Sequence, residues 1–127
     1  MKLVLKGKIP SKKNSKIIVC RNGRPLLLSS KNYREWHEEQ SWLIKKYIPK
    51  QPIKKCKIEM AFYSGDKRLY DLSNKAESAM DFLVDNKIIE DDNYSICSEL
   101  LLKFGGIDKI NPRVEIEIYE EEQRNKV

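Results

Sequence analysis

Two groups of oxygen-bearing side chains in the second half of the chain have the types and spacing to hold a divalent cation. Asp71, Asn74, Glu77 and Asp81 follow one another at steps of three or four residues, so a helix would place them on one stripe. Three consecutive acidic residues at 90–92 come after a short return over residues 86–89. We expect that return to bring the chain back beside the helix, where both groups could face one site.

Carboxylate clusters of this kind suit Mg²⁺ or Mn²⁺, because these hard cations prefer oxygen ligands and keep several waters. In phosphodiester hydrolysis such a metal polarises a phosphoryl oxygen and supplies a bound hydroxide. Packing like charges together is unfavourable without a cation, which favours a binding site. The alternative interpretation is that Asp71 only caps a helix and residues 90–92 only form a solvated turn.

The positive charge of the chain lies mainly at the other end. The formal net charge is +6, and the first 25 residues contain no acidic side chain. They carry Lys2, Lys6, Lys8, Lys12, Lys13, Lys16, Arg21 and Arg24. A basic surface favours polyanions because phosphate contacts release condensed counterions. A nuclease needs a basic surface that holds phosphate and a separate acidic cluster that holds cations.

Periodicity predicts the elements that would position these groups. Residues 55–63 alternate apolar and charged side chains, which is typical of a half-buried strand, and a basic loop follows at 64–68. Residues 72–85 predict a helix with its apolar face formed by Leu72, Ala76, Ala79, Met80 and Leu83. Asp71 would begin this helix, where a carboxylate suits the helix dipole.

The first half predicts a strand, a hairpin and another helix. Residues 2–6 alternate as a short strand, and residues 7–15 are loop-like. Asn22-Gly23 separates apolar runs at 16–20 and 25–28, which predicts a hairpin. A helix capped by Ser29 or Ser30 would then run until Pro49 stops it. Apolar and aromatic side chains recur there at helical spacing, and we interpret Tyr33, Trp36 and Tyr47 as core-facing; the recurring positions are Tyr33, Trp36, Gln40, Leu43, Ile44 and Tyr47.

The C-terminal part predicts two more strands. The first covers 94–104 and is interrupted by Gly105-Gly106; the second covers 113–119. Residues 120–127 are charged and are expected to form a flexible tail. The 127 residues therefore predict a single α+β domain, with a mixed sheet and two helices.

The composition further limits the classes of protein and of metal site that we expect. No apolar run approaches the roughly 20 residues that cross a membrane, so we expect a cytoplasmic protein. Cys20, Cys56 and Cys97 form no Cys-x-x-Cys pair, so a thiolate zinc site is not expected. We interpret all three as buried strand residues with reduced thiols. His37, the only histidine, is expected on a helix surface rather than as a base or ligand.

Several of these motifs together resemble one nuclease family. Asp-Leu-Ser-Asn at 71–74, Asp81 seven residues after the Asn, and the later Asp91-Asp92 pair resemble the core motif of the RusA-type Holliday-junction resolvases. That motif reads Asp-Leu-Asp-Asn-Leu-x-Lys-Ala-x-x-Asp, with a later Asp-Asp. The segments 10–14 and 23–34 are similar to the family's first loop and to its hairpin leading into the first helix.

The resemblance implies a homodimer that nicks two strands of a four-way DNA junction symmetrically, in a reaction that depends on Mg²⁺. A two-fold dimer fits a two-fold substrate. By position, Asp71 matches the first metal-site aspartate and Asp92 the essential second residue of the Asp-Asp pair, with Asp91 its neighbour. Asn74 and Asp81 match the Asn and the helix Asp of the motif.

Two positions depart from the family pattern. Ser73 stands where the second aspartate is expected, and Glu77 stands where a functional lysine is expected. Because these positions are four residues apart on a helix, we hypothesise that Glu77 supplies the missing carboxylate. Lys75 or Arg68 would then replace the lost positive charge. With this substitution the expected metal ligands are Asp71, Glu77, Asp91 and Asp92.

Basic side chains near this motif are expected to contact DNA phosphates, which position a duplex without reading its sequence. They are Lys12, Lys13, Lys16, Lys67, Arg68 and Lys75. The resemblance also suggests that Asn14 lies near the active site. A phage or prophage origin is plausible for such a protein.

Three functions remain open at this point. The first is a Mg²⁺-dependent, structure-selective endonuclease that resolves branched DNA in recombination and repair. The second is a DNA-binding dimer that keeps the fold but has lost catalysis, which the changes at Ser73 and Glu77 would permit. The third is a basic structural or phage-assembly protein without a metal site.

Overall fold

The computed structural model describes residues 1–11, 16–29 and 31–122. Along the chain the elements are β1 (Lys2–Lys6), β2 (Lys16–Arg21), β3 (Arg24–Ser29), α1 (Lys31–Leu43), the 3₁₀ helix η1 (Lys45–Tyr47), β4 (Cys56–Ser64), α2 (Leu72–Asp85), β5 (Cys97–Ile107) and β6 (Arg113–Glu120). This mixture of helices and strands confirms the predicted α+β class. None of the described helices is long and apolar enough to cross a membrane.

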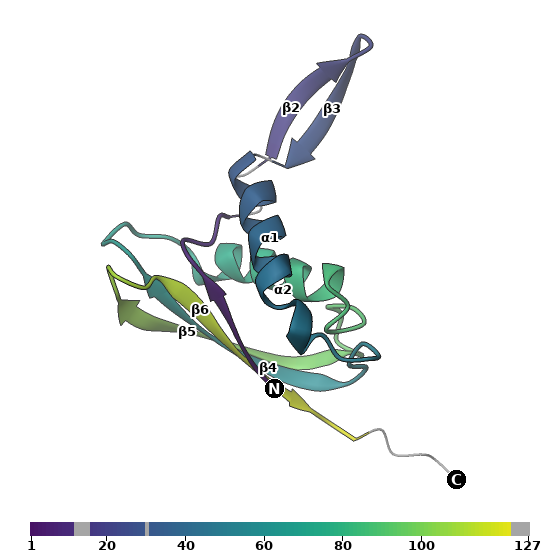
Figure 1. Ribbon diagram of the computed structural model, residues 1–127, viewed down its shortest axis with the longest axis vertical. Coiled ribbons are helices and arrows are strands. Elements are labelled where there is room, and N and C mark those ends of the chain that lie inside the picture. Colours follow the sequence, from purple (N-terminus) through teal and green to yellow (C-terminus); the bar gives the residue numbers. More distant parts are fainter. Residues whose placement is uncertain (12–15, 30, 123–127) are drawn as a thin grey trace.

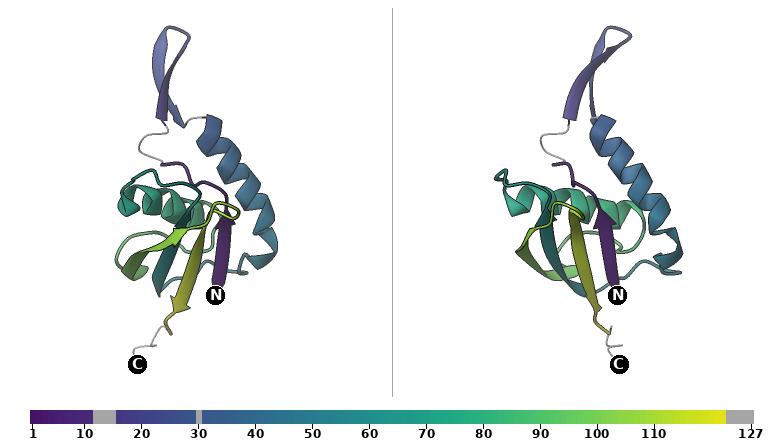
Figure 2. Two further views of the ribbon diagram at one scale, coloured as in Figure 1. Left: turned by 90° about the vertical axis from the view of Figure 1, so that its left-hand side faces the viewer. Right: turned by 60° about the vertical axis from the view of Figure 1, so that its left-hand side comes forward.

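The main sheet has the order β1-β6-β4-β5, and its two edges are β1 and β5 (Figure 2). β6 is antiparallel to both β1 and β4, whereas β4 and β5 run parallel. A parallel pair needs a crossover connection, and α2 supplies it. The β4–α2–β5 unit therefore fixes which end of α2 lies at which end of the sheet.

One face of the sheet is buried under both helices. Alternation along β4 buries Cys56, Ile58, Met60, Phe62 and Ser64, while the charged residues between them stay accessible. Equivalent alternation in β1 and β6 buries Leu3, Leu5, Val114, Ile116 and Ile118. The helices also contact each other, because the rings of Trp36 in α1 and Phe82 in α2 lie 5.6 Å apart. The result is a two-layer domain with one core.

The hairpin of β2 and β3 extends away from this body (Figure 1). Asn22 and Gly23 at its turn have positive φ angles of 53° and 72°. Two positive φ values are the requirement of a type I′ turn, which matches the twist of the flanking strands. The hairpin predicted from Asn-Gly is therefore confirmed.

Four local predictions differ from the structure. α1 ends at Leu43 and the chain tightens into a 3₁₀ turn, so Tyr47 loses the helical register and is 51% exposed instead of core-facing. β5 continues through the glycine pair to Ile107, with a register shift against β4 at that point. Cys20 is exposed, unlike Cys56 and Cys97.

The fourth difference concerns the predicted tail. Glu120 belongs to β6 and pairs with Cys56, and the backbone N–H of Glu121 donates to the carbonyl of Lys55 at 2.9 Å. Glu120 is therefore part of the sheet and Glu121 is bonded to the residue before β4, because main-chain hydrogen bonds continue past the last apolar position of β6. Residues 123–127 lie outside the described part of the chain.

Candidate active site at the head of helix α2

Asp71 is the N-cap residue of α2, as its position in the sequence predicted. Its side chain makes no capping hydrogen bond, and it accepts a long hydrogen bond of 3.5 Å from Asn74 Nδ2 at Oδ2. The residue is exposed. An anion at this position is favoured by the helix dipole. The Asp71 carboxylate therefore lies at the surface at the head of α2, with oxygens accessible to a ligand.

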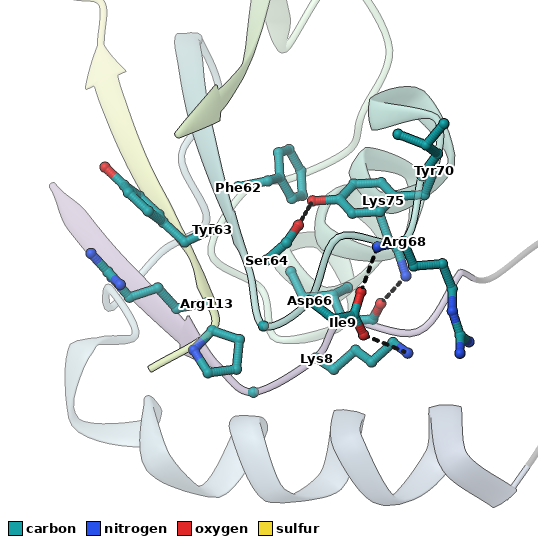
Figure 3. A pocket seen from close by; sticks show the side chains of 14 residues that line it. Lys8, Ile9, Phe62, Tyr63, Ser64, Asp66, Arg68, Tyr70, Lys75 and Arg113 are labelled. Carbon is teal, nitrogen blue, oxygen red and sulfur yellow. Dashed lines mark hydrogen bonds and ion pairs between the residues drawn. The ribbon is translucent and has the colours of Figure 1, made fainter. Parts of the chain in front are cut away.

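The head of α2 is fastened to the rest of the domain by hydrogen bonds (Figure 3). The hydroxyls of Ser64, at the end of β4, and Tyr70 lie 2.6 Å apart. Lys75 Nζ and Ser78 Oγ donate to the backbone carbonyls of residues 9 and 10, at 2.5 and 2.6 Å. These contacts fix Asp71 beside the carboxyl end of β4 and beside the loop that follows β1.

A basic cavity opens next to this head. Its lining includes Lys8, Arg68, Lys75 and Arg113, with Asp66 as the acidic side chain among them (Figure 3). Asp66 accepts a hydrogen bond from the backbone N–H of Arg68 at 2.9 Å and lies 4.0 Å from Lys8 Nζ. Positive charge therefore exceeds negative charge around the cavity, which favours an anionic ligand.

Lys75 is half-buried among these cations. Its ammonium lies 5.1 Å from the centre of the Tyr70 ring. Burial, followed by the nearby charge of Lys8, lowers the pKa of Lys75 from its ordinary value. Because its ammonium donates a hydrogen bond to the carbonyl of Ile9, Lys75 links α2 to the loop after β1. Its predicted contact with a DNA phosphate remains a prediction.

Asp91 and Asp92 lie in the loop between α2 and β5. Asp91 accepts hydrogen bonds from the backbone N–H of Asp92 at 2.8 Å and from Asn93 Nδ2 at 3.1 Å. Within the described residues, no hydrogen-bond or ion-pair partner is found for the Asp92 carboxylate, and this residue is exposed. Asp91 thus shapes the turn, whereas Asp92 has oxygens available to a ligand.

This loop is tied to the start of β4. The backbone N–H of Glu90 donates to the carbonyl of Ile53 at 3.0 Å, and that of Cys56 donates to the carbonyl of Ile96 at 2.7 Å. Asp71, in contrast, follows the end of β4. The 14 residues of α2 lie between the two groups, and at 1.5 Å per residue this helix is about 21 Å long.

The expected convergence of the two acidic groups within one chain is therefore wrong. A Mg²⁺ ion binds its ligands at about 2.1 Å, so one ion cannot bridge opposite ends of α2. Among the residues that the structure describes, no three Asp, Glu, His or Cys side chains gather closely enough to hold a metal. The return at 86–89 does not run back along α2, because Ile89 instead forms a bridge with Ile53.

Other predicted site residues are placed as follows. Glu77 is exposed on α2 and Asn74 is half-buried. Asp81, by contrast, accepts a hydrogen bond from the Tyr33 hydroxyl at 3.0 Å and joins α2 to α1. Lys67 and Arg68 are exposed in the loop before α2.

Part of the predicted DNA-binding set lies beyond the described coordinates. Lys12, Lys13 and Asn14 fall outside the described residues, and for Lys16 only the backbone in β2 is described. The predicted contribution of the first loop to the site thus remains a prediction.

Two basic residues near the cavity were not singled out from the sequence. Lys8 was counted only within the basic N-terminal segment, and nothing local marked it as a neighbour of α2. Arg113 begins β6 and stacks 4.0 Å from the Tyr63 ring centre, while its guanidinium donates to Asp108 at 2.9 Å. The Arg113 guanidinium is therefore engaged in contacts within the domain. The ammonium of the exposed Lys8, in contrast, remains accessible to a ligand.

Comparison with known proteins shows the family of the chain. The chain matches the profile of the family described as Endodeoxyribonuclease RusA over residues 8–119. The chain belongs to the RusA endodeoxyribonuclease family. The match starts before the basic first loop and ends near the end of β6, so it includes both acidic groups and the crossover between them. No curated protein matches the sequence significantly.

Membership of the RusA family supports hydrolysis of DNA as the activity of this protein. The accessible carboxylate of Asp71, the amide of Asn74 and several basic side chains lie at the head of α2. The basic side chains can hold a phosphate beside the Asp71 carboxylate.

Proposed function

We propose that this protein is a structure-selective endodeoxyribonuclease that resolves Holliday junctions or related branched DNA by paired nicking, with Mg²⁺ or Mn²⁺ as cofactor. The observation that carries the proposal is the RusA family match over residues 8–119. The proposed catalytic and metal-binding residues are Asp71, Asn74, Glu77, Asp91 and Asp92. Their setting would be a cytoplasmic enzyme of recombination or repair.

The carboxylates of a single chain do not fit a divalent cation, because α2 keeps Asp71 about 21 Å from the Asp92 end. Asp71 and Asp92 nevertheless each have accessible carboxylate oxygens. We therefore propose that the working enzyme is a homodimer in which these residues come together from different copies. A two-fold dimer then has two equivalent sites, one for each strand that is cut.

The cations around the head of α2 support binding of the DNA backbone beside such a site. Lys8, Lys67 and Arg68 are exposed there and can contact phosphates. Phosphate contacts make affinity fall as salt rises. Their role is to place a scissile phosphodiester next to Asp71, while selectivity for a branched substrate would come from the two-fold arrangement of the sites.

A second candidate is a DNA-binding dimer with weak or no catalysis. Two observations favour it: Ser73 replaces one carboxylate of the family motif, and Glu77 replaces its cation. Both positions are exposed on α2. Glu77 lies one turn beyond Ser73, so its carboxylate can take over the missing role only if the cation sits on that exposed face.

A junction cleavage assay separates the two candidates. Purified protein is incubated with a synthetic four-way junction with and without Mg²⁺, beside Asp92→Asn and the matched control Glu90→Gln. The endonuclease requires cleavage that depends on Mg²⁺, is lost in Asp92→Asn and is kept in Glu90→Gln. Tight junction binding without cleavage in Mg²⁺ or Mn²⁺ would favour the non-catalytic dimer.

The role of Glu77 is tested in the same assay with Glu77→Gln. If Glu77 supplies the missing carboxylate, this variant loses most of its cleavage while its junction affinity stays near that of the wild type. Full Mg²⁺-dependent cleavage by Glu77→Gln would exclude the compensation.

A further inference from the structure

The cavity at the head of α2 has a wall of apolar and aromatic residues. This wall includes Ile9, Phe62, Tyr70 and Pro112, and Tyr70 directly precedes Asp71 in the chain (Figure 3). The cavity has a volume of about 100 Å³, several times the roughly 10–15 Å³ that a single water requires. A flat ring can therefore enter, whereas a lone ion would leave most of the wall uncovered.

Hydrogen bonds within the domain hold the sides of this cavity in place. The backbone N–H of Gly7 donates to the carbonyl of Pro112 at 2.9 Å, and that of Asp108 donates to the carbonyl of Ser64 at 2.7 Å. The hydroxyls of Ser64 and Tyr70 lie 2.6 Å apart. The cavity is therefore preformed, as sites that bind small ligands usually are.

The exposed residues Lys8, Arg68 and Leu69 form the rim of the cavity, and two of the three are cations. A phosphate alone would not need the apolar wall, and an apolar ligand alone would not need the cations. A nucleotide suits both, because it joins a flat base to a phosphate. Asp66, which also lines the cavity, can accept a hydrogen bond from an amino group of a base.

Leu69 is almost completely exposed on this rim. Its exposed fraction is 96%, and it lies between Arg68 and Tyr70, two residues before Asp71. Packing within the described part of the chain therefore does not account for a large aliphatic side chain at this position. Apolar side chains such as leucine are the ones that DNA-binding proteins insert between base pairs to unstack them.

We propose that this cavity receives the base of one nucleotide at the branch point, and that Leu69 keeps this base out of the stack. The inference rests on the proposed function and identifies the part of the substrate that the head of α2 recognises. The phosphate of the same nucleotide would contact Lys8 or Arg68. The neighbouring phosphodiester would then lie beside Asp71.

Such a cavity would make the protein selective for branched DNA before any bond is cut. Removing a base from a continuous duplex costs stacking and pairing energy, and the cost is lowest where the base is already poorly stacked or unpaired. At a branch point the stack of a helix is interrupted. The cations cannot supply this selectivity by themselves, because phosphates are present in branched and unbranched DNA alike.

The first test measures unstacking in the absence of cleavage. Synthetic four-way junctions, each with one fluorescent aminopurine base at a different position next to the branch point, are mixed with the protein in EDTA. Fluorescence should rise at one of these positions and should not rise in an unbranched duplex of the same sequence. A junction that is bound with no rise at any position would overturn the proposal.

Leu69→Ser tests the role of Leu69, with Ile110→Ser as its matched control. Both side chains are 96% exposed, but only Leu69 lines the cavity. Leu69→Ser should abolish the rise in fluorescence and raise the Kd for the junction at least about 5-fold, the loss expected for one base contact. Its Kd for the duplex should stay unchanged, and Ile110→Ser should behave as the wild type. Equal effects of the two substitutions, or no effect of Leu69→Ser, would contradict the assignment.

Gly65→Leu tests the cavity itself. A Cβ at Gly65 would lie 3.4 Å from the Pro112 ring, and both residues line the cavity. A leucine there should narrow the space and abolish the rise in fluorescence, whereas Gly65→Ala should largely keep it. Circular dichroism and urea unfolding show whether each variant is folded. A full rise in folded Gly65→Leu would exclude entry of the base into this cavity.

These measurements separate the inference from the proposed enzyme. Unstacking that depends on Leu69 in a protein that never cuts DNA would support the inference and reject the enzyme. Mg²⁺-dependent cleavage at the wild-type rate by both Leu69→Ser and Gly65→Leu would keep the enzyme and reject the inference. A free nucleotide is tested by calorimetric titration with deoxyadenosine monophosphate. Binding of this ligand to the cavity, with no unstacking in any junction, would also overturn the proposal.

Discussion

Mixing two inactive variants, Asp71→Asn and Asp92→Asn, should restore cleavage that neither shows alone. The reason is geometric. One chain holds these carboxylates at opposite ends of the 14-residue helix α2, about 21 Å in length, which is far beyond the reach of one Mg²⁺ ion. If two copies share each site, a mixed dimer has one site with both substitutions and one site with neither.

The size of the recovery follows from random exchange of subunits. About half of the dimers are then mixed, each with one intact site of two, so about a quarter of the wild-type number of sites is restored. Nicking should therefore return at about a quarter of the wild-type rate per dimer. Paired cutting should stay far lower, because no mixed dimer has two intact sites.

The assay follows a synthetic junction labelled separately on each strand, after the variants have been unfolded and refolded together. Different affinity tags on the two variants show how much mixed dimer has formed. Mixing Asp71→Asn with Asp71→Ala is the matched control, since every site in that mixture keeps a defect at Asp71. No recovery in a preparation with abundant mixed dimer would refute the shared site.

Three further predictions concern the stability of the domain and are checked by urea unfolding, and a fourth concerns thiol reactivity. Gly105→Ala should destabilise the domain by about 1–3 kcal/mol, since a Cβ there would lie 2.6 Å from the ring of Tyr63. Ser78→Ala should cost about 1–3 kcal/mol, because its fully buried hydroxyl holds a loop carbonyl at 2.6 Å. Burial, with a smaller contribution from a neighbouring thiol, raises the pKa of Cys56 from 9.0 to about 12. Wild type should therefore lose stability between these pH values relative to Cys56→Ala, because its unfolded chain releases the thiol proton first. A native thiol assay should find Cys20 reactive and Cys56 protected.

The predictions that the structure confirms depend on local patterns. Alternation along residues 55–63 was enough to predict β4, because one face of that strand meets the core and the other meets water. Met80 and Leu83 were predicted to face the core, and they are 6% and 0% exposed. The Asn-Gly turn was predictable because it needs positive φ angles that few residues adopt.

The sequence could not reveal the relation between the two acidic groups. Their proximity along the chain suggested a common site, but that inference required residues 86–89 to return along α2. The structure instead pairs β5 parallel to β4, so the chain must enter β5 at the end where β4 begins. Strand direction is a long-range property, and the same residues at 86–89 are compatible with either direction.

Parallel pairing of β4 and β5 also determines where the two acidic groups lie. A parallel β4–α2–β5 unit necessarily separates the residue that caps α2 from the loop that enters β5. It also leaves β5 at the sheet edge, with Leu101 exposed and no described strand beside it. Within the described residues, β5 thus separates the two carboxylates and also forms one edge of the sheet. In such an arrangement cleavage would need association, so a single chain with exposed acidic residues would not cut DNA before it meets its partner.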